Sequence, residues 1–216
     1  MNVYPASTLR YVYLHGLASS PKSAKARKLV DRFSAYGIDL LVPDLNQGDF
    51  THLTLTRQIK QVCTLLADSP TVLIGSSLGG LTAAWVAQQQ AQVDRLFLLA
   101  PAFNFPEHWL TPERERQWSK SGFLDVYHYG EGRVIPLHYG FLADVRRYDL
   151  TKLTREIETT ILHGIRDEVV PISVSRDYVG TRPWAKLVEL DSDHRLTDEI
   201  DRIWEEIEPC GTPPSK

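Results

Sequence analysis

The stretch that decides the fold of this chain is Thr71-Val72-Leu73-Ile74-Gly75-Ser76-Ser77-Leu78-Gly79-Gly80. It opens with apolar and β-branched residues, which are typical of a buried strand. Gly75, Ser77 and Gly79 then occupy the fixed positions of a G-x-S-x-G pattern, and residues 81–87 continue with the apolar sequence of a buried helix. A strand, a sharp turn and a helix form the context in which this pattern predicts a nucleophilic serine.

Two adjacent serines compete for the position at the turn. If Ser76 were the nucleophile, the flanking positions would be Ile74 and Leu78, which are too bulky for a point where strand and helix nearly touch. Ser77 has a glycine at each of the two flanking positions, so it is the expected nucleophile. The simpler interpretation is an ordinary loop whose serine caps the following helix. The rest of the chain must therefore supply partners for the serine.

The bulk composition restricts the classes of protein that fit. The chain has 216 residues, of which 43% are hydrophobic and 24% are charged, which suits one domain with a substantial core. A net charge of -3 without a long basic run argues against nucleic-acid binding. Cys63 and Cys210 are the only cysteines, so we expect neither a disulfide framework nor a metal site. No segment has the pattern of a signal peptide or a membrane span, so we expect a cytoplasmic monomer or homodimer.

Strands alternate with helices along most of the sequence. The predicted strands cover residues 9–14, 38–42, 71–74, 95–100, 159–163 and 184–190. The predicted helices cover residues 21–36, 55–66, 81–87, 172–179 and 196–207. Ser20 and Pro21 are expected to start the first helix, and Gly37 to end it. This alternation predicts an α/β fold with a mostly parallel sheet and helices on both faces.

Residues 101–151 interrupt the alternation with an aromatic, charged and irregular segment. A short helix is expected at 113–117 and a hairpin at 127–137, around Gly130-Glu131-Gly132. Ligands bind parallel sheets at the carboxyl ends of the strands, where Ser77 and residues 15–17 are expected. An insertion on that side predicts a cap that lines a pocket. The simpler interpretation is a surface excursion with a small core of its own.

A serine nucleophile needs a base to accept its proton, and histidine, with a pKa of about 6.5, is suited to this. A carboxylate behind the histidine fixes the tautomer and stabilises the imidazolium. In this architecture the chain order is serine, acid and histidine, each at the end of a strand. Asp167 follows the penultimate predicted strand and His194 follows the last one, so they are the expected partners of Ser77.

Other acids and histidines fit these roles less well. Glu168 would point the other way from its turn, and Asp191 and Asp193 are expected to shape the neighbouring loop or cap the helix after it. His163 ends a strand, where histidine more often packs or bonds to the backbone. The remaining histidines lie in polar or inserted segments with no strand end to place them: His52, His108, His128 and His138.

Ester hydrolysis through serine also needs N–H donors for the oxyanion of the tetrahedral intermediate. One donor is expected to be the N–H of Leu78, directly after the nucleophile, and the other the N–H of Leu17, in the loop after the first strand. His15 is then expected to shape this loop, and Gly16 to let the backbone approach. Two more residues of the loop, Ser19 and Ser20, are within reach of a substrate in principle, but helix capping is the expected role.

With these parts in place, the chain resembles the α/β-hydrolase superfamily. Residues 15–21 (His-Gly-Leu-Ala-Ser-Ser-Pro) and 75–80 (Gly-Ser-Ser-Leu-Gly-Gly) resemble the small YqiA-like esterases, and residues 164–171 (Gly-Ile-Arg-Asp-Glu-Val-Val-Pro) resemble the acid loop of the superfamily. Residues 135–149 are more similar to bacterial acyl-ester and thioester hydrolases with a short cap. The resemblance implies an α/β-hydrolase fold in one domain (1–216). Because few residues precede the first strand, it implies a trimmed, parallel sheet of about six strands with a cap-like insertion at 101–151.

These residues predict a serine hydrolase that acts by acyl transfer and needs no cofactor or metal. Carboxylic esters are the first substrate class, because the aromatic insertion suits a partly apolar acyl or alcohol group. Thioesters, including S-acyl proteins and acyl-CoA, come second. A rival from another class is a non-catalytic binding module on the same fold. Hydrolysis of a C–C bond or of a haloalkane is a weaker third interpretation, and haloalkane chemistry requires a carboxylate at the nucleophile position, where this chain has Ser77.

Overall fold

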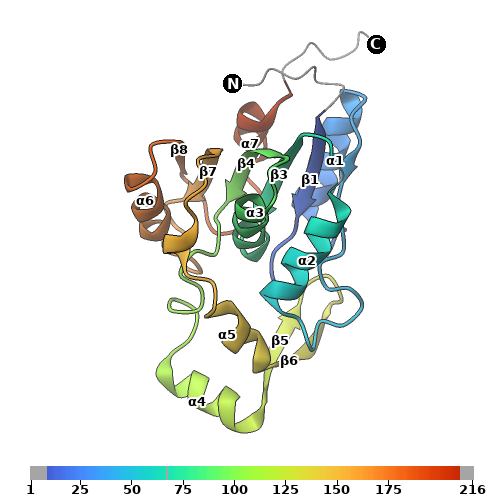
Figure 1. Cartoon of the computed structure of the whole chain (residues 1–216). Coiled ribbons are helices and arrows are strands. Elements are labelled where there is room, and N and C mark those ends of the chain that lie inside the picture. The colour runs from blue at the N-terminus through green and yellow to red at the C-terminus, as the bar shows by residue number, and fades with distance from the viewer. Residues whose placement is uncertain (1–8, 67, 210–216) are drawn as a thin grey trace.

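The computed structural model of the protein describes residues 9–66 and 68–209 (Figure 1). The elements of the main sheet and its flanking helices are β1 (Arg10–Leu14), α1 (Ala24–Ala35), β2 (Leu40–Leu41), α2 (Leu55–Leu65), β3 (Thr71–Ser76), α3 (Leu78–Gln89), β4 (Val93–Leu99), β7 (Glu158–Gly164), α6 (Ser173–Gly180), β8 (Ala185–Leu190) and α7 (Ile200–Ile207). Between β4 and β7 the chain adds α4 (Pro112–Ser121), β5 (Phe123–His128), β6 (Arg133–His138), α5 (Gly140–Val145) and the 3-10 helix η2 (Leu150–Lys152). Cys210 lies outside the described residues.

The main sheet has six strands in the order β2-β1-β3-β4-β7-β8, and every neighbouring pair is parallel. The expected trimmed parallel sheet is therefore confirmed. Because parallel strands share a direction, the loops that follow β1, β3, β7 and β8 emerge at the same edge of the sheet. These four loops, together with the first residue of α3, hold the side chains and backbone groups that the sequence proposes for the active site.

The sheet separates two hydrophobic cores, one on each face. Side chains alternate between the faces along a strand, so Leu73 of β3 packs under α2 and α3, whereas its neighbour Ile74 packs under α1 and α7. Ile59 of α2 belongs to the first core and Phe33 of α1 to the second, and both are almost fully buried. Figure 1 shows α2 and α3 together in front of the sheet. The expected helices on both faces are confirmed.

The first helix begins later than the sequence predicted. Its N-cap is Ser23, whose hydroxyl accepts a hydrogen bond from the Ala26 N–H, so the helix starts at Ala24 and Ser20 is not its cap. Ser20 instead accepts from the Lys22 N–H in the preceding turn. The prediction was wrong because two serines three residues apart can both act as caps. The end was predicted correctly, since Gly37 adopts a φ of 68° just after the helix.

Three other boundaries differ from the prediction. The strand expected at 38–42 is reduced to β2, because only two of its residues pair with β1 at this edge of the sheet. The last helix begins at Ile200 rather than at Leu196, since Leu196 has a φ of 52° that a helix cannot contain. The inserted helix is longer than 113–117, because Thr111 caps α4 at its start and Gly122 ends it in the left-handed conformation.

The inserted segment contains the expected hairpin and covers loops of the main sheet. Strands β5 and β6 pair antiparallel around Gly130 and extend further than the predicted 127–137. The Tyr129 N–H donates to the Ala18 carbonyl oxygen at 2.8 Å, and the His138 N–H donates to the Thr51 carbonyl oxygen at 2.8 Å. The hairpin therefore lies against the loops that follow β1 and β2, on the side where the cap was expected. Helix α5, which follows the hairpin, was not predicted.

Candidate active site

Ser77 lies at the turn between β3 and α3 in a strained backbone conformation, with φ 53° and ψ -118°. Such a conformation costs a non-glycine residue on the order of 1–3 kcal/mol. Strand and helix approach so closely that a Cβ on Gly75 would lie 2.4 Å from the Gly79 carbonyl oxygen, and one on Gly79 would lie 2.1 Å from the Leu14 carbonyl oxygen. The expectation that both flanking positions must be small is confirmed.

Gly79→Ala tests this close approach. The added methyl group meets backbone atoms at the end of β1 and the start of the loop after it, and these atoms cannot move away as a flexible side chain could. We expect the free energy of unfolding to fall by about 3 kcal/mol or more, as measured by urea denaturation. Gly180→Ala is the matched control, because a Cβ there would meet no atom within 4 Å. Equal unfolding midpoints for the two variants would contradict the geometry.

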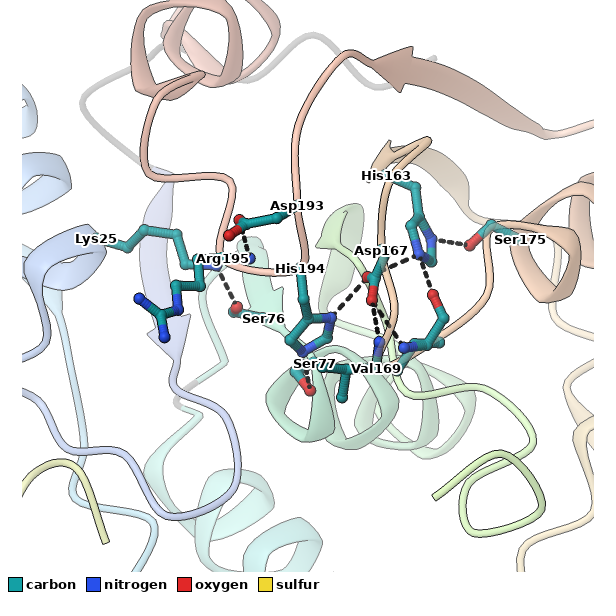
Figure 2. A network of polar contacts seen from close by, with 11 residues as sticks. Lys25, Ser76, Ser77, His163, Asp167, Val169, Ser175, Asp193, His194 and Arg195 are labelled. Atoms are coloured by element: carbon teal, nitrogen blue, oxygen red, sulfur yellow. Dashed lines mark hydrogen bonds and ion pairs between the residues drawn. The ribbon is translucent and has the colours of Figure 1, made fainter. Parts of the chain in front are cut away.

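The three side chains that the sequence proposed are brought together at the carboxyl edge of the sheet (Figure 2). His194, in the loop after β8, has its Nε2 3.1 Å from the Ser77 Oγ. Its Nδ1 lies 2.6 Å from the Oδ2 of Asp167, in the loop after β7. An ionised carboxylate can only accept, so Nδ1 carries the ring proton and Nε2 has its lone pair towards the serine hydroxyl. This tautomer allows His194 to accept a proton from Ser77.

Asp167 is held as an ionised carboxylate by donors on both of its oxygens. Its side chain is fully buried, which alone would raise its pKa. Hydrogen bonds from His163 and His194 outweigh burial and hold the pKa well below its usual range. The other oxygen, Oδ1, accepts from the Val169 and Val170 N–H groups, both at 2.8 Å. The carboxylate is therefore charged at neutral pH and fixed in orientation.

The two N–H groups expected to bind an oxyanion belong to Leu17, in the loop after β1, and to Leu78, directly after Ser77. Within residues 9–66 and 68–209, no group accepts a hydrogen bond from the Leu17 or the Leu78 N–H. The loop after β1 passes directly against the serine, because a Cβ on Gly16 would lie 3.3 Å from the Ser77 Cβ. His15 holds this loop, since its Nε2 accepts from the N–H of the distant Leu45 at 3.0 Å and its Nδ1 contacts the neighbouring Gly16 carbonyl.

The alternative acids and histidines take other partners. The exposed Asp191 pairs with Arg166, and Asp193 accepts from the Arg195 N–H at 2.8 Å, so both shape the loop as expected. Among the described residues, four other histidines make no contact with Ser77: His52, His108, His128 and His138. His163 bonds to the backbone, as predicted, but it also contacts Asp167 at 3.1 Å, which the sequence did not indicate.

Lys25 of α1 is a further polar side chain at this site that sequence reasoning missed. Its Nζ donates to the Oγ of Ser76, next to the nucleophile, at 2.8 Å (Figure 2). Burial lowers the pKa of Lys25 from 10.5 to about 8, although the nearby carboxylates of Asp167 and Asp193 act to raise it. No local signal could have revealed this contact, because 51 residues separate the two partners.

The lowered pKa of Lys25 makes stability depend on pH in a defined direction. Between pH 8 and 10.5 the unfolded chain keeps a proton that the folded chain has released, so this group adds stability as the pH rises. Below pH 8 the cost of the buried charge is fully present. We expect Lys25→Met to remove this slope, so that the stability of the wild type relative to the variant increases from pH 7 to pH 10. Urea unfolding at several pH values measures it, and a difference that stays constant with pH would contradict it.

The described part of the chain holds neither a metal-binding cluster nor a membrane-spanning helix. No three side chains among histidine, cysteine, aspartate and glutamate gather there as a metal ion would require. None of the helices in residues 9–66 and 68–209 has the length and apolar character needed to cross a bilayer.

Solved structures with the same fold include the mouse alpha/beta hydrolase domain-containing protein 10, with a TM-score of 0.73 and 21% identity over 92% of this chain and 90% of that chain. Est1E from Butyrivibrio proteoclasticus, solved with bound ferulic acid, gives a TM-score of 0.74 and 19% identity over 94% and 90% of the two chains. A monoacylglycerol lipase from Paleococcus ferrophilus gives 0.72 and 16% identity over 96% and 98%. These likenesses confirm the α/β-hydrolase fold.

Among curated proteins, the chain is similar to the palmitoyl-protein thioesterase ABHD10, mitochondrial, of Pongo abelii. The two are 27% identical over 169 residues, which make up 72% of this chain and 55% of the relative. The Homo sapiens protein of the same name is 26% identical over 169 residues. The chain thus spans about half the length of the curated relatives it matches. A family model matches residues 10–208, nearly the whole described chain, and the chain belongs to that family, the Uncharacterised protein family (UPF0227).

Proposed function

We propose that this protein is a serine hydrolase that cleaves carboxylic esters by acyl transfer, with Ser77, His194 and Asp167 as its catalytic triad. The observation that supports this best is the continuous hydrogen-bond chain from the serine hydroxyl through both ring nitrogens to the carboxylate. The strained turn at Ser77 adds support, because it presents the hydroxyl at the end of the strand. The hydrolases among the structural neighbours support the broader class.

Acylation begins when the Ser77 oxygen attacks the ester carbonyl while its proton passes to His194 Nε2. The imidazolium that forms is stabilised by Asp167, which already accepts from Nδ1. As the tetrahedral intermediate collapses, the C–O bond to the alcohol breaks and His194 returns the proton to the leaving oxygen. Water then attacks the acyl-enzyme, gives its proton to His194 and releases the carboxylic acid, after which Ser77 regains its hydrogen.

The negative oxygen of each tetrahedral intermediate is held by the N–H groups of Leu17 and Leu78. Both are without an acceptor among the described residues, so they can bond to the oxyanion without first breaking another hydrogen bond. The N-terminus of α3 starts at Leu78 and adds the positive end of its dipole at the same point. Loss of one such donor costs about 3 kcal/mol of transition-state stabilisation.

Thioester hydrolysis is the second candidate, and the curated relatives favour it. Both are named palmitoyl-protein thioesterases, and their similarity covers 72% of this chain. The same triad chemistry applies, because a thiolate is a better leaving group than an alkoxide and needs less help from His194. The choice between the two therefore depends on the acyl and leaving groups that the site admits.

Matched substrates separate these candidates. The experiment measures kcat/KM for p-nitrophenyl esters, for acyl-CoAs with the same acyl chains, and for an S-palmitoylated peptide. We expect the esters to have the higher kcat/KM at each chain length. If kcat/KM were higher for the thioesters, the ester proposal would be wrong and thioester hydrolysis would take its place. If well-folded protein hydrolysed neither class, the proposal would be wrong and a non-catalytic binding module would stand in its place.

The hairpin tip is expected to hold the Leu17 N–H in place. A Cβ on Gly130 would lie 2.7 Å from the Cβ of Ser20, in the loop whose Ala18 carbonyl accepts from the Tyr129 N–H. Gly130→Ala should push the tip away from this loop, and we expect kcat to fall on the order of 10-fold. Steady-state kinetics on the best ester measures it, with a Gly180→Ala variant as control. An unchanged kcat would show that the hairpin does not position this donor.

A further inference from the structure

Asp167 has a second histidine beside it. We propose that His163 is a positioning residue of the triad: it donates to Asp167 from the side opposite His194, and Ser175 fixes its tautomer. This inference rests on the proposed function, because it assigns a role within the same catalytic site. Figure 2 shows the two rings on either side of the carboxylate. His163 and Ser175 are both fully buried, so they cannot touch a substrate.

The protonation of His163 follows from its partners. Its Nε2 lies 2.8 Å from the Val170 carbonyl oxygen, which can only accept, so Nε2 must carry a proton. The same N–H points to the Asp167 Oδ2 at 3.1 Å, which is also an acceptor. The Nδ1 lies 2.8 Å from the Ser175 Oγ, and the hydroxyl donates to it in the neutral ring. A cationic ring in this fully buried place would carry a cost that the neutral form avoids.

Five groups therefore form one chain that is nearly symmetric about Asp167. On the open side, the Ser77 hydroxyl bonds to His194, which donates to Oδ2. On the buried side, the Ser175 hydroxyl bonds to His163, which donates to the same oxygen. Only the first pair faces the solvent. The second pair fixes the orientation of Oδ2 without competing for the proton that His194 receives.

The shared oxygen gives His163 an effect on the reaction that packing alone would not have. Its N–H withdraws part of the negative charge of Oδ2, which weakens the hold of Asp167 on the His194 imidazolium. Among the described residues, the charged group that His163 contacts is Asp167, whose Oδ2 it shares with His194. On the neighbouring strand β8, Glu189 pairs in register with His163, but its carboxylate accepts two hydrogen bonds from Arg176, both at 2.8 Å. Removing the N–H of His163 should therefore strengthen the stabilisation of the His194 imidazolium by Asp167.

The test compares His163→Phe, which keeps a ring but no donor, with His163→Gln, whose amide can donate from the Nε2 position. We expect the phenylalanine variant to lower kcat on the order of 10-fold with KM nearly unchanged. We also expect it to move the acidic limb of the kcat/KM profile to higher pH, and glutamine to restore both. A folded His163→Phe variant with wild-type kcat and a wild-type pH profile would overturn the inference.

A second measurement does not depend on the folding of a variant. Nitrogen-15 NMR of histidine-labelled wild-type protein at pH 7 should show His163 as a neutral ring protonated at Nε2. A ring protonated at Nδ1, or an imidazolium, would overturn the inference. Failure of the proposed function would look different: Ser77→Ala would hydrolyse esters like the wild type. If Ser77 is required and His163→Phe changes nothing, only the inference about His163 fails.

Discussion

Replacing Ser77 with alanine is expected to lower kcat/KM for p-nitrophenyl esters by about 10⁴-fold or more. Alanine removes the hydroxyl that lies 3.1 Å from the His194 Nε2, so no acyl-enzyme can form. The fold should persist, because alanine adds no atom to the tight turn. Steady-state hydrolysis measures the loss, and the thermal unfolding midpoint shows that the variant is folded.

Ser76→Ala is the matched control for this variant. Ser76 is adjacent in sequence, yet its hydroxyl accepts from Lys25 and takes no part in the chain to Asp167. We expect its kcat/KM to stay within about 10-fold of the wild type, because the reacting groups are untouched. If the two serine variants lost activity equally, or if Ser77→Ala kept wild-type turnover, the assignment of the nucleophile would be wrong.

Asp167→Asn is expected to have the second largest effect, a fall in kcat of about 10⁴-fold. The amide keeps the size of the carboxylate, but it cannot stabilise the His194 imidazolium and it can donate to the ring in place of accepting. His194 then favours the tautomer that carries its proton on Nε2, towards Ser77. In that tautomer the ring cannot accept the serine proton. The measurement is kcat on the best ester, together with the thermal unfolding midpoint.

The neighbouring Glu168→Gln supplies the control for this second variant. Glu168 is exposed, and its replacement removes one negative charge from the same turn, so the kcat of this variant should remain near the wild-type value.

The two variants should also differ in acid stability. The folded pKa of Asp167 is depressed, so its contribution is present above the unfolded pKa of about 3.9 and is lost as the pH falls. Of the two variants, only Asp167→Asn should make the free energy of unfolding less dependent on pH in the acid range. Equal kcat values for the two variants would contradict the role of Asp167.

The sequence predicted the main sheet, and it predicted that the three side chains proposed as a triad would meet, because both depend on local signals. A buried strand, a G-x-S-x-G turn and an apolar helix placed Ser77. The strand ends before Asp167 and His194 placed the other two, since parallel strands bring their carboxyl ends to one edge. What the sequence could predict was therefore which loops meet, and the structure adds the distances between their side chains.

Contacts made only in the folded chain were missed. His163 is four residues from Asp167, but whether its ring turns towards the carboxylate depends on the turn between them and on Ser175 of α6. Lys25 reaches Ser76 from a helix that the sequence does not place relative to β3. Helix α5 was missed as well, and it is held by Asp144, which accepts from the Thr56 hydroxyl and N–H at the start of α2.

Labelling with a fluorophosphonate probe, followed by peptide mass mapping, tests most directly whether Ser77 is an activated nucleophile. The probe reacts with a serine hydroxyl only where a base withdraws its proton. The proposed triad predicts one modified peptide that contains residues 76 and 77, fragmentation that places the label on Ser77, and loss of the label in His194→Ala. Absence of labelling in well-folded protein, or a label that persists in His194→Ala, would contradict the account.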